Sequence, residues 1–171
     1  MGDPKKPRKK YSSPRHPWRS DQLLSELNLV GTYGLRNKRE LWKAKTELSR
    51  IRHQARLLLA TPPNERIVKE SKLMSRLRRL GLISSSATLD DVLGLTVEDI
   101  LNRRLQTIVW KKGLAKTPYQ ARQMITHGHI MVNDRVVTIP SYMVSSDEEG
   151  SVRIREDSPL IKVVQSGGKA A

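Results

Sequence analysis

The stretch ARQMITHGHIMVNDR, residues 121–135, decides the fold class, because the spacing of its apolar residues changes within it. Ala121 and Ile125 lie one helical turn apart, whereas Ile130 and Val132 follow the two-residue period of a strand. A helix therefore gives way to a strand inside these residues. The change indicates an α+β protein.

The strand that follows this helix is predicted to form a hairpin. Asn133 and Asp134 are a candidate two-residue turn, and RVVTI, residues 135–139, supplies the returning strand. SVRIRE, residues 151–156, shows the same alternation and is a candidate third strand, after an acidic surface turn at residues 147–150. The C-terminal half is thus expected to hold a small antiparallel sheet.

The N-terminal half is predicted to be helical. Asn37 is a candidate N-cap, and the apolar residues after it repeat at spacings of 3 and 4, as in a heptad seam: Leu41, Ala44, Leu48, Ile51, Ala55 and Leu58. Because this seam is short, we expect an intramolecular helical hairpin and not a coiled-coil dimer. Further helices are predicted from Ser20 to Gly31, from Pro63 to Gly81, from Thr96 to Gly113 and from Thr117 to Gly128.

Charge is the strongest global signal. The 171 residues include 32 Lys and Arg against 17 Asp and Glu, which gives a net charge of +15 and a pI near 10.5. A chain this basic usually binds a polyanion, so nucleic acid and an anionic membrane are the candidates. The longest apolar run is only residues 57–60, and residues 1–19 form a basic, proline-rich arm, so neither a membrane span nor a secretory signal is predicted. Nucleic acid is therefore the favoured partner, and no membrane partner is expected.

Neither a metal site nor an enzyme is predicted. The chain has four His and no Cys, so disulfides and thiolate ligands are excluded, and His127 and His129 would need borrowed carboxylates to hold zinc. No phosphate-binding glycine loop and no nucleophile elbow occurs. The acidic residues fall near helix starts and in a turn, where the helix dipole or solvent accounts for them. We therefore expect no catalytic residue, no cofactor and no small-molecule substrate.

The same residues fit RNA more fully. The helix start at Thr117 offers free N–H groups and a positive dipole end to phosphate, with cations and neutral donors around it: Lys111, Lys112, Lys116, Arg122, Gln123, His127, His129, Asn133 and Arg135. On the seam helix, cations outnumber acids and predict a phosphate-facing surface that includes Arg39, Lys43, Arg50 and Arg56. The alternative is an ordinary solvated face, with the two histidines only ending a helix and filling a turn.

One long stretch resembles a known RNA-binding domain. Residues 103–141 carry Arg-Leu, Gly-x-Ala-x-Thr, Ala-Arg-Gln, His-x-His-Ile-x-Val-Asn and Pro-Ser, the pattern of the domain named after small-subunit ribosomal protein S-four. The resemblance implies two helices packed on a short antiparallel β-sheet, the αL motif. It places the family's RNA-facing positions on Arg104, Lys112, Lys116, Thr117, Arg122, Gln123, His127, His129 and Asn133. Gln106 departs from the pattern, since many relatives carry Asp there, as does Asp134, where many carry Gly.

The rest of the chain resembles the same family. Residues 31–59 look like the N-terminal helical region of ribosomal protein S-four in its archaeal and eukaryotic branch, and residues 89–106 look like that branch's junction. Some bacterial relatives carry a Cys cluster for zinc, but this chain has no Cys, so zinc is not carried over. The expected organisation is a basic extension over 1–19, a helical rRNA-binding domain over 20–95, an S-four-type RNA-binding domain over 96–160 and a flexible tail over 161–171.

The resemblance implies a structural, non-enzymatic constituent of the small ribosomal subunit in the cytoplasm. It implies a primary binder of small-subunit (16S-type) rRNA that nucleates assembly of the subunit body. Implied partners are ribosomal protein S-five, other small-subunit proteins, and mRNA near the channel through which it enters, with an influence on decoding accuracy. The alternatives are a free-standing RNA-binding or RNA-modification accessory protein with an S-four-type domain, and a protein of the membrane surface.

Overall fold

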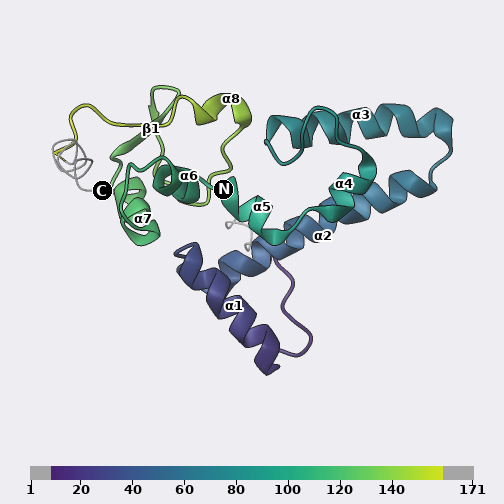
Figure 1. Cartoon of the computed structure of the whole chain (residues 1–171), viewed down its shortest axis with the longest axis horizontal. Helices are drawn as coiled ribbons and strands as arrows, with labels where there is room; N and C mark the ends of the chain where they lie inside the picture. The colour runs from purple at the N-terminus through teal and green to yellow at the C-terminus, as the bar shows by residue number, and fades with distance from the viewer. Residues whose placement is uncertain (1–8, 160–171) are drawn as a thin grey trace, which may run out of the picture.

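The computed structural model describes residues 9–159, which form a helical half and a smaller half built on a sheet (Figure 1). The elements in chain order are α1 (Ser20–Thr32), α2 (Lys38–Ala60), α3 (Pro63–Arg79), α4 (Leu89–Gly94), α5 (Val97–Asn102), α6 (Leu105–Lys111), α7 (Pro118–Thr126), β1 (Ile130–Val132), β2 (Arg135–Val136), α8 (Ser146–Glu149) and β3 (Arg153–Ile154). The three strands form one antiparallel sheet in the order β2–β1–β3. This confirms the predicted α+β class. The first eight residues of the basic extension and the predicted tail lie outside the described residues.

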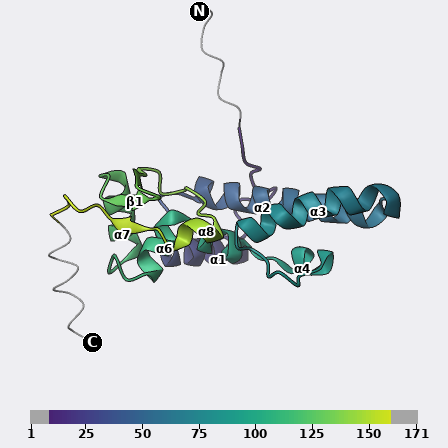
Figure 2. The same ribbon diagram turned by 90° about the horizontal axis from the view of Figure 1, so that it is seen from above.

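The long helix α2 forms the spine of the helical half, with α3 running back beside it as a hairpin (Figures 1 and 2). Asn37 caps α2 by accepting a hydrogen bond from the backbone N–H of Glu40, and all six residues of the predicted seam are buried. The seam packs on Leu73, Met74 and Leu77 of α3 in one apolar cluster. The capping and the seam prediction are therefore confirmed.

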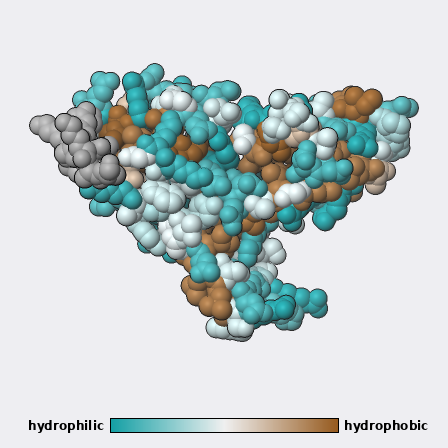
Figure 3. Space-filling model, viewed as in Figure 1, coloured by the Kyte–Doolittle hydropathy of each residue, from teal (hydrophilic) through white to brown (hydrophobic). Residues whose placement is uncertain are grey.

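The outer end of the α2–α3 hairpin is not part of this core. Ile67 and Val68 continue the apolar pattern of α3 in the sequence, yet they are 69% and 57% exposed. The buried packing of α3 on α2 begins only at Leu73, and within residues 9–159 no element covers Ile67 and Val68. Apolar surface is visible at this end of the hairpin in Figure 3. No helix among the described residues is long and apolar enough to cross a membrane.

The helix predicted from Thr96 to Gly113 is two helices, α5 and α6, and the prediction of one continuous helix is wrong. Arg104 between them is extended, with φ −73° and ψ 142°. The backbone there bonds to a distant segment: the N–H of Leu105 donates to the carbonyl of Tyr142, and the N–H of Val144 donates to the carbonyl of Arg103. These long-range bonds replace helical ones, and the spacing of apolar residues carries no sign of them.

The break between α5 and α6 also divides the core. One apolar cluster runs from Tyr33 to Leu101, and a second runs from Leu105 to Val152. Helix α5 thus belongs to the helical half, although the sequence pattern placed the division before it, at residue 96. In the second cluster, α6 and α7 pack against β1. Ala121 and Ile125, whose one-turn spacing predicted the helix, are buried there together with Met124.

The β1–β2 connection is the predicted two-residue turn. Asn133 and Asp134 have φ of 48° and 63°, so both central residues occupy the left-handed region that a type I′ turn requires. Pairing of Val132 with Arg135 fixes the register. The strands are shorter than predicted, because the chain leaves the sheet before Pro140, whose carbonyl accepts the backbone N–H of Gln106 at the start of α6.

Helix α1 is attached to α2 through a buried carboxylate. Glu26 is 2% exposed and accepts hydrogen bonds from Gln22, from Lys45 at 2.9 Å and from the indole of Trp42 at 3.2 Å. Burial alone raises the pKa of Glu26, but the hydrogen bonds from Gln22, Lys45 and Trp42 outweigh it and hold the pKa at about 2. The ionised side chain is therefore part of the packing of α1.

Acid should loosen this contact. Because the folded pKa of about 2 lies below the ordinary value of 4.5, the stabilisation by Glu26 is complete above about pH 4.5 and is lost as pH falls towards 2. Over that range the parent chain should lose up to about 3 kcal/mol more than Glu26→Gln. Urea unfolding at a series of pH values measures the difference. Parallel pH profiles for the two chains would contradict this role of Glu26.

The turn should be sensitive to the residue at position 133. Asn tolerates positive φ better than Ala does, so Asn133→Ala should destabilise the chain by about 1 kcal/mol. Asn133→Gly is the matched control and should be close to neutral, because Gly adopts this conformation without strain. Chemical unfolding of the three chains compares them. Equal losses for Ala and Gly would show that the side chain, and not the backbone, matters.

Candidate nucleic-acid interface

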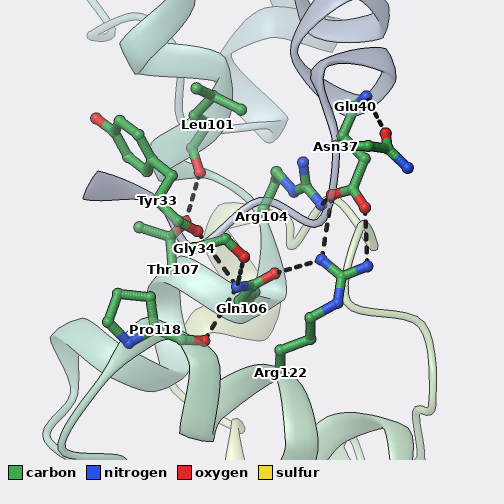
Figure 4. Close-up of polar contacts among 10 residues, drawn as sticks. All are labelled: Tyr33, Gly34, Asn37, Glu40, Leu101, Arg104, Gln106, Thr107, Pro118 and Arg122. Atoms are coloured by element: carbon green, nitrogen blue, oxygen red, sulfur yellow. Dashed lines mark hydrogen bonds and ion pairs between the residues drawn. The ribbon is translucent and has the colours of Figure 1, made fainter. Parts of the chain in front are cut away.

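The two halves meet at Glu40, a half-buried residue in the first turn of α2 (Figure 4). Its carboxylate accepts hydrogen bonds from Arg104 at 2.6 Å and from Arg122 of α7 at 2.8 Å. Burial alone raises the pKa of Glu40, but the bonds from Arg122 and Arg104 outweigh it and lower the pKa below its usual value. One charged group of the helical half thus holds two cations of the second half.

We call the contact of Glu40 with Arg104 and Arg122 the joint between the two halves. Gln106 of the second half adds hydrogen bonds to it. It is fully buried, and its side-chain amide donates to the carbonyls of Tyr33 at 3.2 Å, Gly34 at 2.8 Å and Pro118 at 3.0 Å (Figure 4). Its carbonyl oxygen accepts from Arg122 at 3.3 Å. An amide group has two protons, so three acceptors must share them. Gln106, which departs from the family pattern, therefore connects the loop before α2 to the start of α7.

Backbone packing makes the same joint tight. Gly34 has φ +57°, and a Cβ atom built on it would lie 2.7 Å from the Cβ of Pro118. Only glycine permits both the left-handed conformation and this approach. The helical half and the second half are thus held in a single arrangement by charge, amide bonds and close backbone contact.

The start of α7 has the geometry of an anion site. Thr117 caps the helix by accepting the backbone N–H of Gln120 at 3.1 Å, and the side chain of Gln120 accepts the backbone N–H of Lys116 at 2.8 Å. Lys116 and Thr117 are both exposed at this end, and Gln123 is exposed farther along the helix. Thr117 therefore caps α7, but the reciprocal bond of a full capping box is not formed, because Gln120 accepts the N–H of Lys116 and not that of Thr117.

The two histidines lie at the other end of α7. His127 is exposed and ends the helix, Gly128 follows with φ +75°, and His129 is half-buried with Nδ1 3.1 Å from Ser158 Oγ. The two imidazole rings are 6.3 Å apart and tilted by 31°. Across residues 9–159, no group of three or more His, Cys, Asp or Glu side chains is arranged to hold a metal ion.

The hairpin and the end of α6 carry the remaining predicted residues of the second half. Asn133 and Arg135 are exposed beside the turn. Lys111 and Lys112 line a different feature, a cleft of about 380 Å³ at the end of α3, where Lys112 donates to the backbone carbonyl of Glu149. Lys112, directly after α6, is therefore bound to the acidic segment that contains Glu149.

The predicted cations of α2 are all exposed: Arg39, Lys43, Arg50 and Arg56. By the 100° step of a helix, the first three lie within about 40° of one another, whereas Arg56 points about 100° away from Arg39. Lys43 also lines a cleft of about 280 Å³ together with Arg104 and Arg122. The structure thus brings Lys43 to the joint, whereas Arg39, Arg50 and Arg56 are exposed on α2 away from that cleft.

The described part of the basic arm lies on α2. Tyr11 stacks on Trp42 with ring centroids 5.9 Å apart, and the backbone N–H of Ser12 donates to Thr46 at 3.0 Å. The guanidinium of Arg39 lies over the Tyr11 ring, 5.8 Å from its centroid. Residues 9–19 form no helix or strand, as the composition of the arm predicts.

Two residues that build the joint, Glu40 and Gln106, could not be recognised from local sequence patterns. Glu40 is one of the acidic residues near helix starts, and Gln106 is a polar side chain that is nevertheless fully buried. The one signal at Gln106 was its departure from the family pattern. Arg104, at 5% exposure, and Arg122 are paired internally, so their predicted contact with RNA stays a prediction.

Comparison with known families agrees with this two-part geometry. The model described as "Ribosomal protein S4/S9 N-terminal domain" matches residues 5–102, and the "S4 domain" model matches residues 103–149. Their division falls at the break between α5 and α6. The chain belongs to the S4 family of ribosomal proteins. This confirms the resemblance and the predictions of a ribosomal, RNA-binding chain of the small subunit that is not an enzyme.

Similar proteins extend over nearly the whole chain. It is 56% identical to the small ribosomal subunit protein uS4 of Ignicoccus hospitalis over 165 residues, which cover 96% of this chain and 99% of that protein. It is 57% identical to the protein of the same name from Hyperthermus butylicus, over 95% of this chain and 92% of that protein. The Nitrosopumilus maritimus protein uS4 is 56% identical over 96% of this chain and 82% of its own length. The archaeal side of the predicted branch is thus represented among the relatives.

Removing the shared acid should weaken the joint strongly. Glu40→Gln leaves Arg104, whose side chain is only 6% exposed, without its charged partner, and should cost about 3 kcal/mol of folding free energy. Urea unfolding at neutral pH measures it. Glu65→Gln is the matched control, since Glu65 pairs with Lys69 on open surface and its loss should change nothing measurable. Equal effects of the two substitutions would contradict the role of Glu40.

Proposed function

We propose that this chain is a primary binder of small-subunit (16S-type) rRNA and that it nucleates assembly of the subunit body. The observation that carries the proposal is the rigid joint at Glu40, which fixes two cationic surfaces in one body. Folded RNA offers phosphates on several helices at fixed distances. A protein whose two surfaces cannot move apart binds one arrangement of those phosphates and favours it over others.

The S4 domain would supply one surface. The exposed N-terminal end of α7 at Thr117, with Lys116 beside it, presents N–H groups and positive charge to a phosphate. Gln123, His127 and Asn133 are exposed neutral donors that set the register against 2′-hydroxyls or unpaired bases. The resemblance to the family implies RNA-facing roles for these positions, which supports this part of the proposal.

The second surface would be the cationic face of α2. Arg39, Lys43 and Arg50 follow one side of the helix, and the basic arm lies against the same helix at Trp42. Arg122 remains 23% exposed while it pairs with Glu40, so it can offer an edge of its guanidinium to a phosphate at the cleft. Arg104 also lines that cleft and is proposed to act by holding the joint.

The family also supports finer proposals about partners. We include contacts with ribosomal protein S-five and other small-subunit proteins, a position near the channel where mRNA enters, and an influence on decoding accuracy. These rest on family membership and not on contacts within this chain. The place of action is the cytoplasmic small ribosomal subunit.

Salt dependence tests the electrostatic surfaces. Filter binding measures the affinity of the full chain for small-subunit rRNA. The logarithm of the association constant should fall linearly with the logarithm of the salt concentration, with a slope of about −0.7 to −0.9 for each phosphate that the protein neutralises. Lys116→Ala should weaken binding and reduce that slope by about one phosphate. Arg78→Ala, which removes an exposed cation outside the candidate residues, is the control and should have a smaller effect.

Two results would overturn the proposal. A flat salt response would exclude binding through the phosphates. In sucrose gradients, a chain found only in the ribosome-free fractions would favour the free-standing accessory protein, whereas cosedimentation with small subunits is the expected outcome.

A further inference from the structure

A groove of about 580 Å³ lies between α2 and α3 towards the outer part of their hairpin. Leu57, Leu58 and Leu73 line it, and Leu57 is 55% exposed. Three cations also line it, Lys69, Lys72 and Arg76, whereas none of the described lining residues is acidic. The groove thus combines an apolar floor with a positive rim.

The residues that line the groove recur at helical spacing in both α2 and α3. Each helix contributes positions i, i+3, i+4 and i+7: Gln54, Leu57, Leu58 and Thr61 from α2, and Lys69, Lys72, Leu73 and Arg76 from α3. This spacing follows one face of a helix for two turns, so the groove is a straight trough about 10 Å long. Its length and direction suit a third helix lying along the hairpin.

The rest of the described chain leaves this face open. Arg52 of α2 donates to the carbonyl of Leu95, directly after α4, so that side of α2 faces α4. The groove positions of α2 that stand away from the core, Gln54, Leu57 and Thr61, lie between about 140° and 200° around the helix from Arg52. Figure 2 shows α4 on one side of the hairpin only. The groove is therefore on the opposite side, where no other described helix packs.

The chemistry of the groove selects its occupant. Phosphates gain nothing from a leucine floor, whereas aliphatic side chains of a protein helix do, as in other helix-in-groove contacts. The cations of the rim repel a basic segment and attract an acidic one. Lys69 already bonds Glu65 at 2.7 Å, but both side chains are more than half exposed, so this pair holds the lysine weakly.

We propose that the α2–α3 groove docks an acidic amphipathic helix of a protein partner. Aliphatic side chains of that helix seat on Leu57 and Leu73, and its carboxylates pair with Lys69, Lys72 and Arg76. This site is separate from the surfaces assigned to rRNA, so either function can fail without the other.

A synthetic peptide tests the groove directly. The probe is a fluorescent helical peptide with Leu at i, i+3, i+4 and i+7 and Glu at the flanking positions, titrated with the full chain by anisotropy. Leu57→Asp should weaken its binding about tenfold or more, because a charge then replaces the apolar anchor. Leu27→Asp is the matched control, since Leu27 of α1 is also 55% exposed, and it should leave binding unchanged.

Further arms separate the groove from general charge and from RNA. Lys72→Glu should weaken binding of the acidic peptide. A scrambled peptide of the same composition should bind the parent chain far less. Leu57→Asp should leave rRNA binding in the filter assay unchanged. No saturable binding of the peptide, equal binding of the scrambled peptide, or loss of rRNA affinity in Leu57→Asp would each overturn the proposal.

Discussion

The carboxylate of Glu40 is the contact on which the arrangement of the two halves depends. It comes from the first turn of α2, whereas both arginines that bind it come from the second half. Burying a charge is costly unless it is paired and hydrogen-bonded, and here two guanidinium groups meet that condition. The value of such a cluster is geometric more than energetic: it is satisfied in one arrangement of the halves and leaves unpaired charges in any other.

This joint changes how the basic residues of the chain are understood. A net charge of +15 suggests cations free for a polyanion, yet Arg104 is buried and Arg122 is partly so, both bound to the same acid. Among the predicted RNA-binding residues, the exposed cations and donors are on α7, on the hairpin turn, on α2 and at the end of α6. The internal pairs set the positions of these surfaces, and the open residues make them attractive to RNA.

Local chemistry determined what the sequence could predict. Four predicted features depend on residues close together in the sequence, and all four are confirmed. They are the α2 seam, its Asn37 cap, the inward face of α7 and the turn at Asn133. The break after α5 depends on backbone bonds to residues 140–144, and the burial of Gln106 depends on carbonyls about 70 residues away. No local period records such contacts. The joint was therefore beyond pattern analysis, although the family resemblance had marked Gln106 as unusual.

The long-range bonds at the start of α6 have a consequence for the order of folding during synthesis. The helical half, through α5, precedes every one of its partners in the joint along the chain, so it is synthesised before them. Until Arg104, Gln106 and Arg122 have emerged, Glu40 and the carbonyls of Tyr33 and Gly34 lack these partners. The backbone N–H groups at the start of α6 obtain their acceptors later still, because these are the carbonyls of Pro140 and Tyr142. A nascent chain therefore holds a folded helical half with an open docking face, and the second half closes on it as one of the last steps.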